Sequence, residues 1–260
     1  MIRISFQADI KKLRNEVDAI RERQIPFATV LALNEVAAEA QRQMRQRMES
    51  DFDRPTPYTL SATWVRRANK QNLRAEVLLK DESFKSAPAT RWLAPEVEGG
   101  QRPLKRHEYA LRRANVLPEG MFAVPGEGAQ MDAFGNMSRG QIVQILSWFR
   151  AFHYSGYRMN MTDKGRARLA KGSSARAKRY RPPTSYFVVS VGGRGKLKPG
   201  VYMRQGQAHD ARILPVLRFV RRPGYKPRLP FYQTVDVTAR REFEGAFRRG
   251  MAQAMATARR

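Results

Sequence analysis

The feature that most constrains the fold is a long apolar stripe that follows Pro26. The stripe recurs at three- and four-residue steps and comprises Val30, Leu33, Ala37, Ala40, Met44 and Met48. This period is typical of one face of an α-helix, and proline suits the first turn of a helix. We therefore predict a long helix that ends near Asp51, before the two prolines of residues 52–59. A shorter amphipathic helix is predicted over residues 9–23.

The C-terminal segment has a similar pattern from Val237 onward. Phe243, Phe247, Met251 and Met255 are spaced by four, and the exposed face is rich in arginine. This spacing predicts a second long helix that turns the four large side chains away from solvent. Helices are therefore expected at both ends of the chain.

The middle of the chain is richer in strand patterns. Strand-like runs lie at residues 62–68, 73–80, 184–191, 200–204 and 211–220. A turn at residues 69–72 joins the first two, and glycine and proline separate the others. Helical patterns begin at Pro103 and after Ser138. Together these elements predict an α+β fold, in which a long N-terminal helix and a C-terminal helix pack on a mainly antiparallel β-sheet.

The strand pattern is interrupted by helical patterns and by loops rich in glycine and proline. We therefore assign residues 1–84 and 184–260 to the α+β core of the protein. Residues 85–183 are assigned to a large insertion that contains helices, long loops and a basic arm at residues 164–181.

A polar loop precedes the helix that is predicted after Ser138. An acid, a glycine and an amide ahead of a helix could hold an anion or a metal, but calcium binding would need alternating acids and a terminal glutamate. Ser138 and Gln141 form an S-x-x-Q capping box, which explains the helix start, and the preceding glycine and asparagine explain the turn. Asp132 and Phe134 are left without a local structural duty. We expect them to contact a neighbouring subunit.

The strongest compositional signal is charge. The chain has 49 lysines and arginines against 23 acidic residues, a formal net charge of +26, and such a field attracts polyanions. Residues 164–181 contain eight basic residues, no acid and few large apolar groups, so a mobile loop or arm is predicted there. The candidate contacts to DNA or another polyanion are Lys164, Arg166, Arg168, Lys171, Arg176, Lys178, Arg179 and Arg181.

Two uses of this charge are open. Tyr180, Tyr186 and Tyr225 lie among arginines and could stack on bases, while phosphate contacts by the basic residues would depend steeply on salt. Because no recognised reader motif is present, the charge supports contact with nucleic acid that is independent of sequence. The alternative is a solvated basic surface that pairs with acidic neighbours in an assembly.

No constellation of residues for catalysis stands out. Cysteine is absent, which excludes thiolate metal sites and a cysteine nucleophile. Residues 192–200 lack the serine or threonine that follows the lysine of a Walker motif, and the three histidines stand alone. Glu96, Glu98, Glu108 and Asp132 could pair for acid–base chemistry, but no spacing selects any two. We therefore predict a protein that is not an enzyme and that holds no cofactor and no metal.

Several long strings, rather than one motif, carry a family resemblance. They read FATVLALNEVAAEAQRQMRQRM, FDRPTPYTL, NLRAEVLLKDE, WLAPEVEGGQRPLKRHEYALRR, LPEGMFAVPG and MDAFGNMSRGQIVQIL, with LPFYQTVDVTARREFEGAF near the end. These strings resemble tailed-bacteriophage proteins of the minor tail protein Z or tail-completion family. The resemblance covers most of residues 27–150 and, more loosely, the C-terminal segment, whereas residues 151–230 fit the family pattern least well.

The resemblance implies a structural virion protein that completes the tail and joins the tail tube to the head-side connector at the neck. The implied partners are copies of itself in a homo-oligomeric, hexameric ring, a tail terminator or tail tube protein, a head-side connector or head-closure protein, and DNA in the channel. The alternative function is a DNA-binding protein that contacts packaged or channel DNA through its basic region. A cell-wall hydrolase of the virion is the weakest interpretation.

The same resemblance implies a location in the tail or neck of the virion after assembly in the host cytoplasm. The start of the chain lacks the continuous apolar core of a secretory signal. No later run approaches the roughly 20 apolar residues that a membrane span needs, so no membrane partner is expected.

Overall fold

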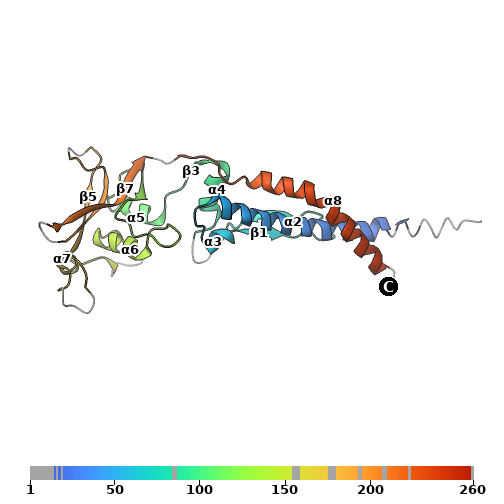
Figure 1. Cartoon of the computed structure of the whole chain (residues 1–260), viewed down its shortest axis with the longest axis horizontal. Coiled ribbons are helices and arrows are strands. Elements are labelled where there is room, and N and C mark those ends of the chain that lie inside the picture. The colour runs from blue at the N-terminus through green and yellow to red at the C-terminus, as the bar shows by residue number, and fades with distance from the viewer. Residues whose placement is uncertain are drawn as a thin grey trace, which may run out of the picture. The chain divides into compact units, whose positions relative to one another are not determined.

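The computed structural model describes residues 15, 17, 18, 20–83, 87–153, 159–174, 180–192, 195–206, 210–221 and 224–258 (Figure 1). The chain divides into two compact units. Residues 1–97 and 227–260 form one, here called the helical unit, and residues 98–226 form the other, here called the sheet unit. Both units contain helices and antiparallel strands, which confirms the predicted α+β class.

Two long helices build most of the helical unit. A π-helical turn, η1 (Ile20–Gln24), leads into α2 (Ile25–Asp51), and α8 (Phe231–Ala258) returns along it. The backbone of α2 at Ala28 lies against Gly250 of α8, whereas Phe231 shares a buried cluster with Met48. The two helices are therefore antiparallel, as the blue and red ribbons of Figure 1 show.

Both helices meet along ridges of residues that are four apart. On α2 the ridge comprises Ala28, Ala32, Val36, Ala40, Met44 and Met48, and on α8 it includes Thr238, Ala246, Gly250 and Ala254. Ridges of this kind interdigitate in the commonest class of helix packing. Small side chains let the backbones come close: a Cβ atom on Gly250 would lie only 2.8 Å from the carbonyl oxygen of Ala28.

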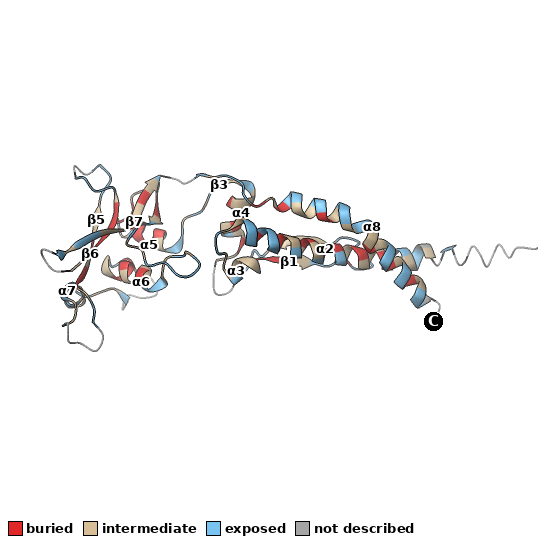
Figure 2. Cartoon of the chain, in the orientation of Figure 1, coloured by how far each residue is buried: buried red, intermediate tan, exposed pale blue. Residues whose placement is uncertain are grey.

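The large apolar stripe of α8 is not the buried face that its spacing predicts. Phe243 is 38% exposed and stacks on Phe247, with 6.0 Å between ring centroids. Met251 and Met255 are half-buried beside the ridge of small residues. The prediction was wrong because residue size, as well as apolar character, decides which stripe of a closely packed helix enters the contact. Figure 2 shows buried and exposed bands alternating along both helices.

A short hairpin and two small helices complete the helical unit. Strands β1 (Thr63–Arg66) and β2 (Glu76–Leu79) pair antiparallel around the predicted turn at residues 69–72. Helix α3 (Pro57–Leu60) starts at the second of the two prolines, and α4 (Thr90–Glu98) was not predicted. The buried side chains of this end are Met44, Met48, Ala62, Ala89, Leu93, Leu229 and Phe231.

The sheet unit is built on a four-stranded antiparallel sheet. Its strands are β4 (Met121–Pro125), β5 (Thr184–Val189), β6 (Gly200–Gln205) and β7 (Arg212–Arg221), in the order β4-β7-β6-β5. Helices α5 (Arg106–Arg113) and α6 (Arg139–Trp148) pack on one face, where Leu111, Ile145 and Val201 are almost fully buried. Strands β3 (Gly100–Gln101) and β8 (Gly224–Tyr225) pair separately.

The boundary between the units differs from the predicted one. Residues 184–226 were predicted to share a core with the terminal helices, but their strands belong to the sheet unit. Strand β4 explains the difference, because its five residues supply an edge of the same sheet by pairing with β7. The sequence gives little sign of so short a strand between a helix and a glycine-rich loop.

Candidate functional site

The basic segment at residues 164–181 begins as an ordered helix. Helix α7 (Asp163–Lys171) starts after Thr162, whose side-chain oxygen accepts a hydrogen bond of 3.1 Å from the backbone N–H of Gly165. Leu169 packs against the buried cluster of the sheet unit. The guanidinium of Arg166 lies over the ring of Trp148, 5.9 Å from its centroid. The predicted mobile arm is therefore wrong for this half, because two side chains anchor it.

Three of the predicted polyanion contacts share the outer side of α7. Lys164, Arg168 and Lys171 are exposed and follow the i, i+4, i+7 spacing of one helix face. Within the described residues, none of the three forms an ion pair with a carboxylate. The acid of this helix, Asp163, pairs instead with Arg150 at 2.6 Å. The outer face of α7 is therefore a row of exposed cations.

The end of the segment returns to the C-terminus of α7. Gly172 ends the helix with φ +71°, and a Cβ atom there would lie 2.6 Å from the carbonyl oxygen of Arg181. The N–H of Ser173 donates to that carbonyl at 2.9 Å, and the N–H of Arg181 donates to the Ser173 hydroxyl at 2.7 Å. Exposed Arg181 therefore lies close to the end of the cation row. The candidates Arg176, Lys178 and Arg179 lie outside the described residues.

The three candidate stacking tyrosines differ in exposure. Tyr186 is buried and its hydroxyl donates to Oε1 of Gln144 at 2.9 Å. Burial raises the pKa of Tyr186 to about 12. Its ring packs edge-on against Trp148, so the prediction that it stacks on bases was wrong. Tyr180 is 57% exposed, while Tyr225 is half-buried in β8.

Asp132 has a structural duty that the sequence did not reveal. Its Oδ1 accepts hydrogen bonds from the N–H groups of Phe134, at 2.9 Å, and Asn136, at 2.8 Å. Asp132 therefore shapes the turn, so the expectation that it has no local structural role was wrong, while its contact with a neighbouring subunit stays a prediction. Phe134 remains 41% exposed, and Met131 beside it is 47% exposed.

Ser138 and Gln141 do not form the predicted capping box. The Ser138 side chain makes no capping hydrogen bond at the start of α6. Gln141 is buried, and its amide accepts from the N–H of Gln130 at 2.7 Å and donates to the carbonyl of Gly128 at 3.0 Å. Gln141 therefore does not cap α6 but holds the backbone of the preceding loop. We call residues 126–136 the presenting loop.

A buried ion pair lies where the chain enters the sheet unit. Glu108 has no exposed surface, and its two oxygens accept from the Arg102 guanidinium at 2.6 and 2.7 Å. They also accept from the N–H groups of Lys105 and Ala123. Burial alone would raise the pKa of Glu108, but these hydrogen bonds outweigh it and lower that pKa. The guanidinium also lies 4.9 Å from the Phe122 ring centroid.

Three of the four carboxylates considered for catalysis are used in separate structural contacts. Glu96 pairs with Arg228 at 2.8 Å in the helical unit, and Glu108 pairs with Arg102 in the sheet unit. Asp132 shapes the presenting loop. Over the described ranges, no three His, Cys, Asp or Glu side chains are grouped to hold a metal.

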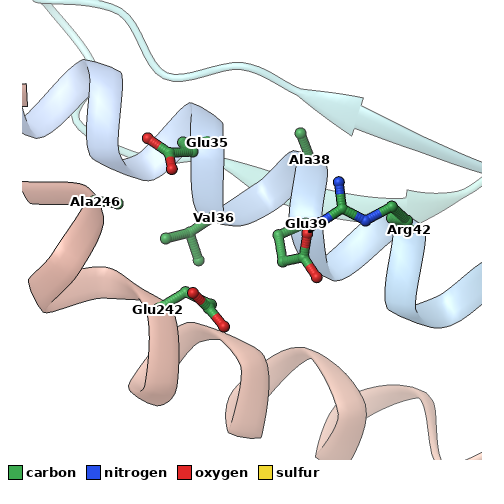
Figure 3. A pocket seen from close by; sticks show the side chains of 7 residues that line it. All are labelled: Glu35, Val36, Ala38, Glu39, Arg42, Glu242 and Ala246. Carbon is green, nitrogen blue, oxygen red and sulfur yellow. Dashed lines mark hydrogen bonds and ion pairs between the residues drawn. The ribbon is translucent and has the colours of Figure 1, made fainter. Parts of the chain in front are cut away.

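A polar hollow of about 320 Å³ lies between α2 and α8 (Figure 3). It is lined by Glu35, Val36, Ala38, Glu39, Arg42, Glu242 and Ala246. Each glutamate has an arginine partner within this unit: Glu35 pairs with Arg249 at 2.5 Å, Glu39 with Arg42, and Glu242 with Arg241. Since these pairs balance its acids, the hollow offers little net attraction for a cation.

The two units carry very different charge. The helical unit has 24 lysines and arginines against 16 acids, and the sheet unit has 25 against 7. The excess is therefore concentrated in the sheet unit, which also carries the cation row and the presenting loop. These two surfaces are the candidate functional sites of the chain.

Comparison with known proteins identifies no relative of this chain. No protein-family model matches the chain, and no curated protein and no solved structure matches it. Among the helices that the structure describes, none combines the length and apolar character needed to cross a membrane.

Proposed function

We propose that this chain is a structural virion protein of a tailed bacteriophage, which completes the tail and joins the tail tube to the head-side connector. The observation that carries the proposal is the presenting loop, whose backbone is held by side-chain hydrogen bonds and which exposes large apolar side chains. Gln141 and Asp132 hold its backbone, while Phe134 and Met131 remain exposed. A preorganised loop loses little conformational entropy on docking, which favours binding of a protein partner.

The family resemblance supports the same function and suggests the partners. The segments that resemble tail-completion proteins include most of α2 and α8, which form one core, and residues 131–136 of the presenting loop. The proposed partners are further copies of the chain in a hexameric ring, a tail terminator or tail tube protein, and a head-side connector or head-closure protein. Such a protein acts through complementary surfaces rather than through chemistry.

Electron microscopy of particles assembled without the protein tests this function. We expect separate heads and tails, or joined particles that are not infectious, and normal infectious virions would overturn the proposal. Complementation with the Phe134→Ala variant should restore assembly poorly, because the apolar tip is lost. The Phe134→Tyr variant keeps the ring and is the matched control, which should restore assembly.

The cation row of α7 favours a second candidate function, contact with packaged or channel DNA. Lys164, Arg168 and Lys171 present positive charge on one face of α7, and exposed Arg181 lies close to the C-terminal end of that helix. Each phosphate contact steepens the fall of affinity with salt by about 0.9 in a plot of log affinity against log salt. Duplex binding through α7 is therefore expected to weaken sharply between low and physiological salt.

Charge removal at α7 tests this second function. The triple variant Lys164→Gln, Arg168→Gln, Lys171→Gln should reduce the salt slope for duplex DNA by roughly 2.7, if each residue contacts one phosphate. The matched control removes three charges from α8, at Arg240, Arg241 and Arg248, each of which has a carboxylate partner. Equal slopes for the α7 variant and the unmodified chain would exclude α7 as the contact.

A further inference from the structure

The four-stranded sheet has a second face that does not belong to the helix-packed core. Side chains alternate between the faces of a strand. Tyr186, Val201 and Met203 enter the buried cluster with α5 and α6, so Phe187, Tyr202 and Arg204 lie on the other face. Phe187 is half-buried and Arg204 is exposed. Tyr202 is only 5% exposed, so this face presents the Phe187 ring beside the exposed Arg204 of the adjacent strand.

The aromatic groups of this face form an ordered platform. Phe187 is opposite Tyr202 in the register of β5 and β6, and their rings stack with 5.6 Å between centroids and 19° between planes. The Tyr202 hydroxyl donates to the carbonyl of Lys198 at 2.8 Å, which fixes the supporting ring. A ring that is already held against a second ring can stack on another planar group with little reorganisation.

Arg204 shows that a planar group fits over Phe187. Its guanidinium lies over the Phe187 ring, 6.0 Å from the centroid. Within the described residues, Arg204 forms no ion pair with a carboxylate. An exposed arginine without such a partner can turn from the ring to a phosphate while a base takes its place. Ile213, which is opposite Arg204 in register and 42% exposed, extends the apolar surface.

The charge around this face selects an anionic partner. Residues 184–221 contain seven lysines and arginines and one acid, Asp210. Glu127, which lies outside this segment, is paired with Arg218 at 2.5 Å. A partner with phosphates and exposed rings satisfies both the charge and the aromatic platform, as single-stranded nucleic acid does.

We propose that the second face of the four-stranded sheet binds single-stranded nucleic acid, with a base stacked on Phe187 and a phosphate held by Arg204. Duplex DNA binds this face less well, because its bases are stacked inside the helix and cannot reach the ring. The site is separate from the cation row of α7 and does not depend on a role in the phage neck.

Fluorescence anisotropy with a labelled 20-nucleotide oligo-dT and the full chain tests the proposal. Loss of one base–aromatic stack corresponds to about 5- to 150-fold weaker binding. We expect that loss for Phe187→Leu, which keeps an apolar side chain but removes the ring, while Phe187→Trp retains affinity. Tyr109→Ala removes an aromatic that is 50% exposed on α5, and this control should bind as the unmodified chain does.

Two further readouts separate stacking from simple charge attraction. The added indole of Phe187→Trp should change fluorescence when oligo-dT binds, and Arg204→Gln should weaken binding by an amount that shrinks as salt rises. Unchanged oligo-dT affinity in Phe187→Leu would overturn the proposal. It would also be overturned if polyglutamate displaced oligo-dT as well as unlabelled oligo-dT does, because the face would then accept any acidic chain.

Discussion

The helical unit and the sheet unit use their arginines in opposite ways. In the helical unit, many arginines of α2 and α8 pair with acids three or four residues away or on the facing helix, as Arg249 does with Glu35. In the sheet unit, acids are few, and the outer side of α7 presents cations to solvent. The comparison indicates that one unit pairs more of its basic residues internally, whereas the other keeps more positive charge available for a partner.

The units also differ in how close packing is achieved. Small residues bring α2 and α8 together in the helical unit, whereas larger side chains and a buried ion pair hold the sheet unit. A ridge of small residues is sensitive to added volume, and a buried ion pair is sensitive to the loss of one partner. Substitutions of these two kinds should therefore affect the two units separately.

The largest effect is expected from Glu108→Gln in the sheet unit. The amide would leave the buried Arg102 charge without a carboxylate, and breaking such a pair costs about 3–5 kcal/mol. Hydrogen exchange read in peptides of β6 should show that loss, while peptides of α8 should keep their protection. The double variant Arg102→Met, Glu108→Gln removes the orphaned charge and should be more stable than the single variant; equal stability would show that the charge is not what matters.

The next largest effect is expected from Gly250→Ala in the helical unit. The new Cβ atom would meet backbone 2.8 Å away on Ala28, so the helices must separate. We expect a net loss of about 1–2 kcal/mol in the free energy of unfolding after the gain in helix propensity. Gly245→Ala is the matched control, because its Cβ atom meets only the flexible end of Arg249 at 3.3 Å. It should gain up to about 1 kcal/mol, and a loss of equal size in both variants would contradict close packing at Gly250.

A smaller effect is expected from the pH dependence of the sheet unit. Burial lowers the pKa of His107 from 6.5 to about 4. Between those values the unfolded chain takes up a proton that the folded chain does not, so stability should fall as the pH drops from about 6.5 to about 4. Denaturation midpoints at several pH values would measure this slope. His107→Gln should flatten it, whereas His153→Gln, at an exposed position, should leave it unchanged.

The smallest effect is expected from salt on the unmodified chain. Screening should relieve self-repulsion in the sheet unit, where 25 basic residues face 7 acids. Amide exchange in β6 should therefore slow as sodium chloride is raised, with little change in α8. If amide exchange in β6 and in α8 responded equally to salt, the difference in charge between the two units would not affect their stability.

Much of the fold follows from local pattern. The period of residues 26–51 predicted α2, and alternation with glycine and proline turns predicted β1, β2, β5, β6 and β7. These elements are predictable because one buried face imposes its period on the sequence. Strand β4 was missed because its five residues, MFAVP, do not alternate between apolar and polar, and its pairing with β7 is set by residues between 92 and 100 positions away.

The candidate sites were less predictable. The basic composition of residues 164–181 indicated a polyanion contact, but only Leu169 and Arg166 in their tertiary setting turn its first half into a helix with one cationic side. Phe134 was chosen from the same pattern as Asp132, yet the structure uses Asp132 to shape the loop. The platform of Phe187 and Tyr202 was missed, since alternation along one strand does not reveal the partner ring on the next.

By itself the sequence determined the class of fold, the two terminal helices and the excess of positive charge, because helix period, strand period and composition are local properties of the chain. Only the tertiary structure decided which stripe of α8 is buried, that Gln141 clamps a loop and that Glu108 is enclosed with Arg102. These outcomes depend on the size and polarity of groups that packing brings together from distant positions in the sequence. A local sequence pattern does not predict such contacts.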